Sequence, residues 1–262
     1  MKAPARLARA TLLSQPSTSL LFLIVFAAGV SGACAQNPAI TAPANCEQTV
    51  GGSEATATPL APGNGRVPVP LQNEFDRVRV NSFPELADKV VGTRAFASSA
   101  DYFQTRFSIS RFLFLQRMHY FVEVNPRIGQ SGPSKESVCA ILAHELVHIS
   151  RMSAGNRIRL LGLARLFSAS YTARFERAAD LEAIRRGYAP GLVSYREWVY
   201  KNIPAKALKQ KRRNYFLPEE ITAIVRLSEG DPGLFDYWKA HVPLDLEQIH
   251  ASVLRSSRVS KK

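Results

Sequence analysis

The stretch Val138-Cys-Ala-Ile-Leu-Ala-His-Glu-Leu-Val-His-Ile149 contains two histidines four residues apart, with a glutamate directly after the first. On a helix, residues four positions apart lie on the same face, so His144 and His148 would present their rings on the same side. The other residues of the stretch are apolar, which predicts a buried helix. Burying Glu145 there without a partner would be costly, so this carboxylate is expected to have a function.

A His-Glu-x-x-His pentapeptide on an ordinary surface helix is the alternative, and the apolar flanks argue against it. The pattern is typical of zinc hydrolases, in which both histidines bind one metal ion. We therefore expect one Zn²⁺ on His144 and His148. Glu145, rotated by one position, is the expected general base that takes a proton from a metal-bound water.

A zinc site of this kind needs a third protein ligand from a second element. We predict Glu176, in a helical stretch from Phe175 that ends at Gly187. Asp180 is one turn further on the same face, where it can hydrogen-bond the far nitrogen of His144 and fix the orientation of the ring. Glu182 is the rival ligand, but it points away from the face of Asp180.

We call the predicted helix that contains His144 and His148 the metal helix. The region before it contains two runs rich in β-branched and aromatic residues, and both are predicted strands that pair with each other. The runs are residues 107–115 and 118–124. Ser134 is the predicted N-cap of the metal helix. The second strand is either an exposed edge, to which an extended substrate could pair, or an interior strand.

Residues 1–35 have the layout of a secretory signal, with three basic residues, an apolar run and then small residues before Gln36. A retained membrane anchor and a lipoprotein signal, with Cys34 as the lipidated residue, are the alternatives. We expect an exported protein of the periplasm or cell envelope.

Residues 36–70 are rich in proline, alanine and threonine and predict a disordered linker, whereas residues 71–262 form the expected domain. Its first part, with apolar residues from Leu71 to Val91 at helical spacing, predicts one or two helices. The cysteines leave the compartment open. Cys139 is expected to be a small buried residue, and a disulfide between Cys46 and Cys139 stays an open alternative.

The chain is basic, with 34 Lys and Arg against 21 Asp and Glu. The predicted leader contains three of the basic residues and no acidic one, so the rest has a net charge of 31 − 21, or +10. Such a surface favours anionic partners. The densest cluster is Lys206, Lys209, Lys211, Arg212 and Arg213, which fits a solvated helix face or loop. It lacks the pattern of a nucleic-acid-binding module, so no nucleic-acid partner is expected.

The segment 156–167 alternates leucine and isoleucine with arginine and is too short and too charged to span a bilayer. We expect this segment to pack into the core. Contact with a membrane interface is the alternative.

Four blocks of this sequence resemble the gluzincin metallopeptidases, and within them the group of HtpX and the CAAX prenyl proteases. The blocks are Phe121-Val-Glu-Val-Asn-Pro126, Ala140-Ile-Leu-Ala-His-Glu-Leu-Val-His148, Glu176-Arg-Ala-Ala-Asp180 and Gly187-Tyr-Ala-Pro-Gly-Leu-Val-Ser-Tyr195. Their order and spacing carry the resemblance over about residues 118–198.

The resemblance implies an α+β fold, mainly helical and zincin-like, with a small β-sheet beside the active-site helix. It implies a zinc metalloendopeptidase that hydrolyses peptide bonds of proteins or peptides, with zinc on His144, His148 and Glu176, Glu145 as general base and Asp180 behind His144. A catalytically inactive zinc-binding scaffold and a basic module that binds anionic surfaces are the alternatives. The multi-span membrane parts of some relatives are absent from this sequence.

A downstream segment, residues 240–249, is similar to a His-Pro element of the same family. Here Val242 separates His241 from the proline, and Gln248 stands where the family tends to have arginine. We predict that His241 donates a hydrogen bond to the oxyanion of the reaction, with Tyr188 and His250 as alternatives.

Overall fold

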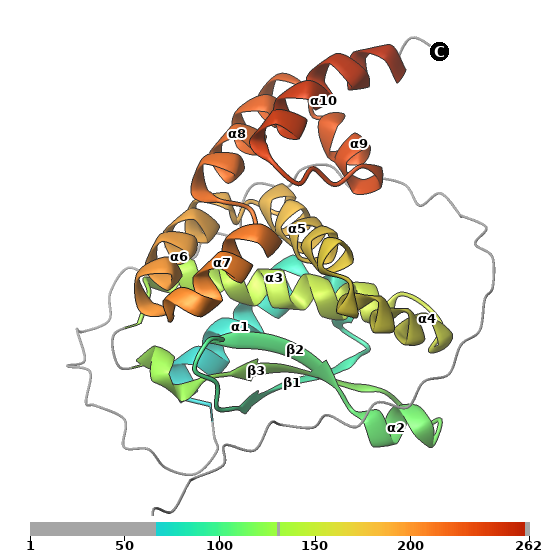
Figure 1. Ribbon diagram of the computed structural model, residues 1–262. Coiled ribbons are helices and arrows are strands. Elements are labelled where there is room, and N and C mark those ends of the chain that lie inside the picture. Colours follow the sequence, from blue (N-terminus) through green and yellow to red (C-terminus); the bar gives the residue numbers. More distant parts are fainter. Residues whose placement is uncertain (1–66, 130–131, 260–262) are drawn as a thin grey trace, which may run out of the picture. The chain divides into compact units, whose positions relative to one another are not determined.

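The computed structural model describes residues 67–129 and 132–259. The predicted signal of residues 1–35 and nearly all of the predicted linker lie outside this range. The described residues form an α+β fold that is mainly helical, with one small sheet (Figure 1). Within them, no helix combines the length and the apolar character needed to cross a bilayer.

The elements before the metal helix are α1 (Val69–Ser82), η1 (Pro84–Leu86), β1 (Val90–Ala95), β2 (Phe103–Phe107), α2 (Ile109–Leu113), β3 (His119–Val124) and η2 (Pro126–Gly129). The later elements are α3 (Lys135–Ser153), α4 (Ile158–Leu161), η3 (Gly162–Phe167), α5 (Ala169–Arg185), α6 (Ala189–Asn202), α7 (Ala205–Asn214), α8 (Pro218–Gly230), α9 (Leu234–Ala240) and α10 (Leu246–Val259).

Helix α3 is the centre of this arrangement, as the sequence predicts. Ser134 caps it, with a side chain that accepts a hydrogen bond from the Ser137 amide at 3.2 Å. The sheet packs on one side of α3, and α5 and α6 cover the other (Figure 1). Every residue from Cys139 to Ile149 is buried. This packing between two layers explains why the helix is apolar on all sides.

The sheet has the order β1-β3-β2, with β1 parallel and β2 antiparallel to β3. The strand that precedes the metal helix, β3, is therefore the interior strand, and β2 is an edge beside α3. The prediction of a strand at residues 118–124 is confirmed, but its partner is β2, and only residue 107 of the predicted run 107–115 belongs to that strand. The rest forms α2 and a turn. Most of its aromatic and aliphatic side chains are exposed and do not cover a face of the sheet.

Of the helices predicted from Leu71 to Val91, the first is confirmed and the end of the stretch is wrong. Leu71, Phe75 and Val78 lie on α1 and are buried as expected, although the helix already begins at Val69. Val90 and Val91, expected on a helix, open strand β1 instead. Their apolar spacing is the same over a short run in either structure, and the pairing with β3 decides between the two.

Glycines shape the contacts of α5 and α6. Helix α5 ends in a Schellman motif, where Gly187 adopts φ 89° and the amide of Tyr188 donates to the Ala183 carbonyl at 3.1 Å. Gly191 faces α3 so closely that an added Cβ would lie 2.5 Å from the Glu136 carbonyl oxygen and 2.8 Å from the Ala140 Cβ. The absence of a side chain at Gly191 therefore sets the distance between α6 and the metal helix.

We predict that Gly191→Ala lowers the free energy of unfolding by about 1–3 kcal/mol, because the added methyl group must push α6 away from α3. Urea denaturation of the full chain measures this change. Gly230→Ala on α8 is the matched control, since nothing lies within 4 Å of a Cβ there. Equal stability of the two variants would contradict the close approach.

Candidate metal centre

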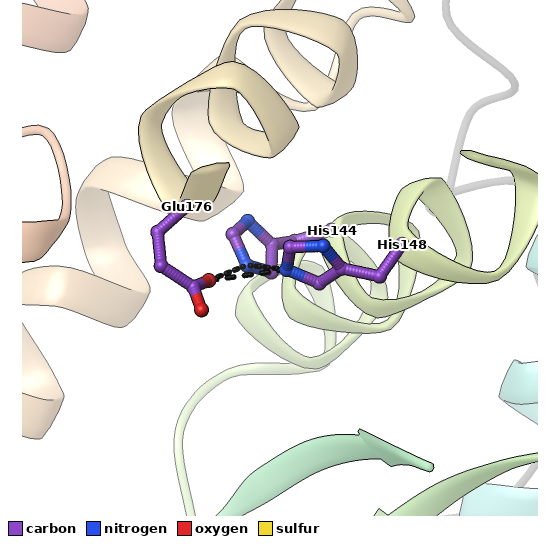
Figure 2. Close-up of side chains that lie close together, drawn as sticks. All are labelled: His144, His148 and Glu176. Carbon is purple, nitrogen blue, oxygen red and sulfur yellow. Dashed lines mark hydrogen bonds and ion pairs between the residues drawn. The ribbon is translucent and has the colours of Figure 1, made fainter. Parts of the chain in front are cut away.

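His144, His148 and Glu176 come together between α3 and α5 (Figure 2). Their ligand atoms all lie within 4.8 Å of one another. The Glu176 Oε2 is 3.2 Å from His144 Nε2 and 3.0 Å from His148 Nε2, and the two Nε2 atoms are 3.2 Å apart. The structure thus brings together the three residues predicted as ligands.

The chemistry of this group fits a cation. His144 Nδ1 is 2.7 Å from the buried Asp180 carboxylate, which selects the tautomer with its proton on Nδ1 and a lone pair on Nε2. That lone pair faces the Glu176 carboxylate and the second imidazole nitrogen. Electron pairs from three residues converging on one point are mutually repulsive unless a positive charge lies between them, and two imidazoles with one carboxylate are a typical catalytic zinc set.

The electrostatic surroundings also favour positive charge at this point. Burial lowers the pKa of His144, but Asp180 and Glu176 outweigh this effect and raise the pKa to about 9. Burial alone would raise the pKa of Glu176, yet the two histidines hold the pKa of that carboxyl well below its usual range. The negative groups that attract a proton to His144 attract a metal ion in the same way.

Asp180 connects the site to the rest of the fold. Besides His144, it accepts hydrogen bonds from Arg196 of α6 at 2.7 Å and from the Phe216 amide at 3.1 Å. Arg196 and Asp180 are both buried, so each compensates the charge of the other. Burial disfavours the charged form of Asp180, but Arg196 and His144 lower its pKa overall.

The two histidines are held by different means. His144 is oriented by the hydrogen bond to Asp180, whereas Nδ1 of His148 is buried and finds no hydrogen-bond partner within the described part of the chain. The ring of His148 instead stacks on Phe175, with centroids 4.5 Å apart and planes 13° from parallel. Phe175, next to the predicted ligand Glu176, therefore positions the second imidazole.

Glu145 does not belong to the ligand group but lines the same cleft. Its Oε2 accepts a hydrogen bond of 2.7 Å from the Thr105 hydroxyl of β2. This bond links the metal helix to the edge strand and aims the carboxylate at the space beside His148 and Glu176. A carboxylate in this place can accept a proton from a reactant in the cleft.

The cleft has a volume of about 490 Å³ and two chemically different walls. All five residues of β2 line it, together with Glu145, His148, Glu176 and Tyr215. Apolar side chains from later elements, Met152, Leu163, Leu166 and Phe175, complete the wall. Its size and mixed lining suit a segment of an organic substrate rather than a bare ion.

Tyr215 is a site residue that sequence patterns do not indicate. Its ring lies 5.7 Å from the His144 ring, and the guanidinium of Arg196 lies over it at 4.4 Å. Burial raises the pKa of this phenol well above its usual value, and Glu176 and Glu145 add to the effect. The hydroxyl therefore keeps its proton and can donate it in a hydrogen bond. Thr105 and Arg196 were likewise not indicated, since only the folded chain brings them to the site.

The other candidate residues lie elsewhere. His241 is exposed, with its Nδ1 3.1 Å from the Tyr237 carbonyl oxygen, and lines a different hollow, with Arg174 and Gln248. Tyr188 bonds Ser82 at 2.6 Å, and His250 is exposed on α10. Glu182, the rival ligand, pairs with Arg185 and Arg186.

The basic cluster of residues 206–213 lies on α7, as a helix face. Lys211 pairs with Asp101 at 2.7 Å and lies over the Tyr215 ring, and Arg212 lies over Tyr200. Part of this charge therefore stabilises the packing of α7.

In comparisons with known proteins, the chain matches no family model, no curated protein and no solved structure.

We predict that Asp180→Asn weakens zinc binding by about 10–100-fold, because His144 loses the charged acceptor that orients it. Competition with a chromophoric zinc chelator measures the affinity. Glu182→Gln, on the same helix but paired with Arg185 and Arg186 away from the histidines, should bind zinc as the wild type does. Circular dichroism must show both variants folded. An unchanged affinity in folded Asp180→Asn would rule out the supporting role.

Proposed function

We propose that this chain is a zinc-dependent metalloendopeptidase with a zincin-like domain. The observation that carries the proposal is the position of Glu145, which opens into the cleft beside His148 and Glu176 but does not belong to the ligand group. A metal site with a structural role has no need of a free carboxylate at its open side. The resemblance of the four sequence blocks to gluzincins supports the same activity.

His144, His148 and Glu176 would hold the zinc ion. Zinc would lower the pKa of a water molecule toward about 7 and polarise the substrate carbonyl. Glu145 accepts the proton of the attacking water, and Thr105 holds its carboxylate in place through Oε2. The same carboxylate then delivers the proton to the leaving amine. Asp180 keeps the imidazole of His144 in the tautomer that can bind the metal.

The negative oxygen that develops on the substrate needs a hydrogen-bond donor. We assign this role to Tyr215 rather than to His241, since Tyr215 lines the cleft and His241 does not line it. Arg196 and Lys211, both above the ring of Tyr215, hold it in position.

The free edge of β2 is suited to bind an extended peptide. The Ser108 amide donates to His119, and the Asn125 amide donates to Tyr102, so the even-numbered residues of β2 make the bonds to β3. The backbone groups of Phe103, Thr105 and Phe107 consequently point toward the open edge. Pairing of a substrate with these groups would fix its backbone without reading each side chain.

We further propose that the protein is exported to the cell envelope. The signal-like pattern of residues 1–35 supports this location. Cys139 supports it as well, because its sulfur is disulfide-bonded, and disulfides persist in oxidising compartments. The other two cysteines of the chain, Cys34 and Cys46, lie outside the described residues.

We predict that Glu145→Gln retains zinc and loses peptide hydrolysis, by at least about 100-fold, because the amide cannot accept the proton of water. Metal analysis and cleavage of a proteome-derived peptide mixture, for variant and wild type, measure both properties. Turnover that survives in the purified variant would exclude Glu145 as the base. Zinc without cleavage in the wild type itself would favour the inactive scaffold.

We predict that Tyr215→Phe lowers kcat by about 100–1,000-fold and changes KM little, since the lost hydrogen bond forms only as the oxyanion develops. Steady-state kinetics on a cleaved peptide measure the two constants. Tyr200→Phe is the matched control, because its buried hydroxyl has no hydrogen-bond partner in the described structure. A raised KM at unchanged kcat would assign Tyr215 to substrate binding alone.

A further inference from the structure

Two neighbouring segments expose an unusual number of large apolar side chains. Ten such residues are exposed in the described part of the chain, and seven belong to α2 with its following turn or to α4 with η3. We call these seven the apolar surface: Ile109, Leu113, Phe114, Leu115, Ile158, Leu161 and Phe167, which are 43–78% exposed. The expectation that the segment 156–167 packs into the core is therefore wrong for most of it, because Leu160 alone is buried among its described side chains.

The two segments form one continuous region. Arg157, just before α4, donates hydrogen bonds to the carbonyl of Arg111 at 3.2 Å and to the carbonyl of Gln116. These two residues lie on either side of the turn after α2. Ile109 shares the cleft wall with Leu163 and Leu166. Figure 1 shows α2 and α4 at the same end of the described domain, beyond the sheet and α3.

The backbone holds these side chains in solvent at a cost. Helix α2 has no buried residue and touches the core through the partly buried Phe112, whose ring packs on Phe107. Leu115 adopts φ 55°, in the left-handed region, which costs a branched residue about 1–2 kcal/mol. The resulting turn exposes three apolar side chains in a row, from Leu113 to Leu115. A strained, exposed apolar turn of this kind indicates a binding surface.

The charges around the apolar surface select its partner. Residues 102–122 and 146–175 contain no aspartate or glutamate, and their arginines are Arg106, Arg111, Arg117, Arg151, Arg157, Arg159, Arg165 and Arg174. Of the acids near this region, Asp88 is paired with Lys89 at 2.8 Å, Glu123 with Arg94 and Arg106, and Asp101 with Lys211. Glu145 and Glu176 lie in the cleft, beside the histidines. A second copy of this chain, with a formal charge of +13, would place like charges together.

We propose that the apolar surface docks on an anionic lipid bilayer. Exposed leucine, isoleucine and phenylalanine side chains enter the boundary between head groups and acyl chains, and exposed arginines of the same segments, such as Arg117 and Arg165, meet the lipid phosphates. The proposal concerns lipid binding and does not depend on peptide hydrolysis.

Flotation with vesicles tests the proposal on the full chain. The vesicles contain equal parts phosphatidylglycerol and phosphatidylcholine, or phosphatidylcholine alone. We expect the wild type to bind the anionic vesicles more tightly, and less so as ionic strength rises. Phe114→Asp and Phe167→Asp should each weaken the partition by about tenfold or more. Val80→Asp, at an exposed residue of α1, should have no effect.

Residues 1–66 are present in every variant, so their contribution cancels in the comparison. A tryptophan at position 114 provides a direct readout: its emission in Phe114→Trp should shift to the blue on anionic vesicles, whereas that of Val80→Trp should not. Unchanged binding of both aspartate variants would overturn the proposal. A wild-type dimer by light scattering that Phe114→Asp converts to a monomer would also overturn it, in favour of self-association.

Discussion

The buried carboxylate of Asp180 is the group on which the arrangement of this protein depends. It joins α5 to α3 through His144, to α6 through Arg196 and to the chain before α8 through the Phe216 amide. An ionised carboxylate inside a protein is costly unless every lone pair has a partner, and here three donors converge on it. The orientation of His144 and the packing of three helices are thus fixed by one side chain.

The parts of the site that follow from local spacing could be predicted from the sequence. His144, His148 and Glu145 are fixed by the helical period, and the same period places Asp180 one turn after Glu176. Arg196 and Tyr215 could not be predicted, since they reach the site only through the packing of α6 and the end of α7 onto α5. Of the fold, the helix that contains His144 and its N-cap follow from the pattern. The run 107–115 looks like a strand because its composition does not show whether its apolar side chains are buried or exposed.

The two sides of the metal centre differ in how firmly they are held. His144 lies on the inner side and is anchored by a charged hydrogen bond, while His148, on the cleft side, is held by its stacking on Phe175. Glu145 lies at the junction of helix and sheet, where Thr105 links the two layers. The cleft side of the candidate centre is therefore positioned by the edge strand as much as by the helix that carries the two histidines.

The free edge of β2 has a consequence for which proteins could enter the cleft. Its outward backbone groups occur at every second residue, a spacing of about 7 Å. A polypeptide pairs with them only if its own amides and carbonyls are unoccupied over several residues. In a folded protein nearly all of these groups are already bonded to one another. If the proposed peptidase pairs its substrate with this edge, it would distinguish unfolded chains from folded ones by the availability of their main chain, without a recognition sequence.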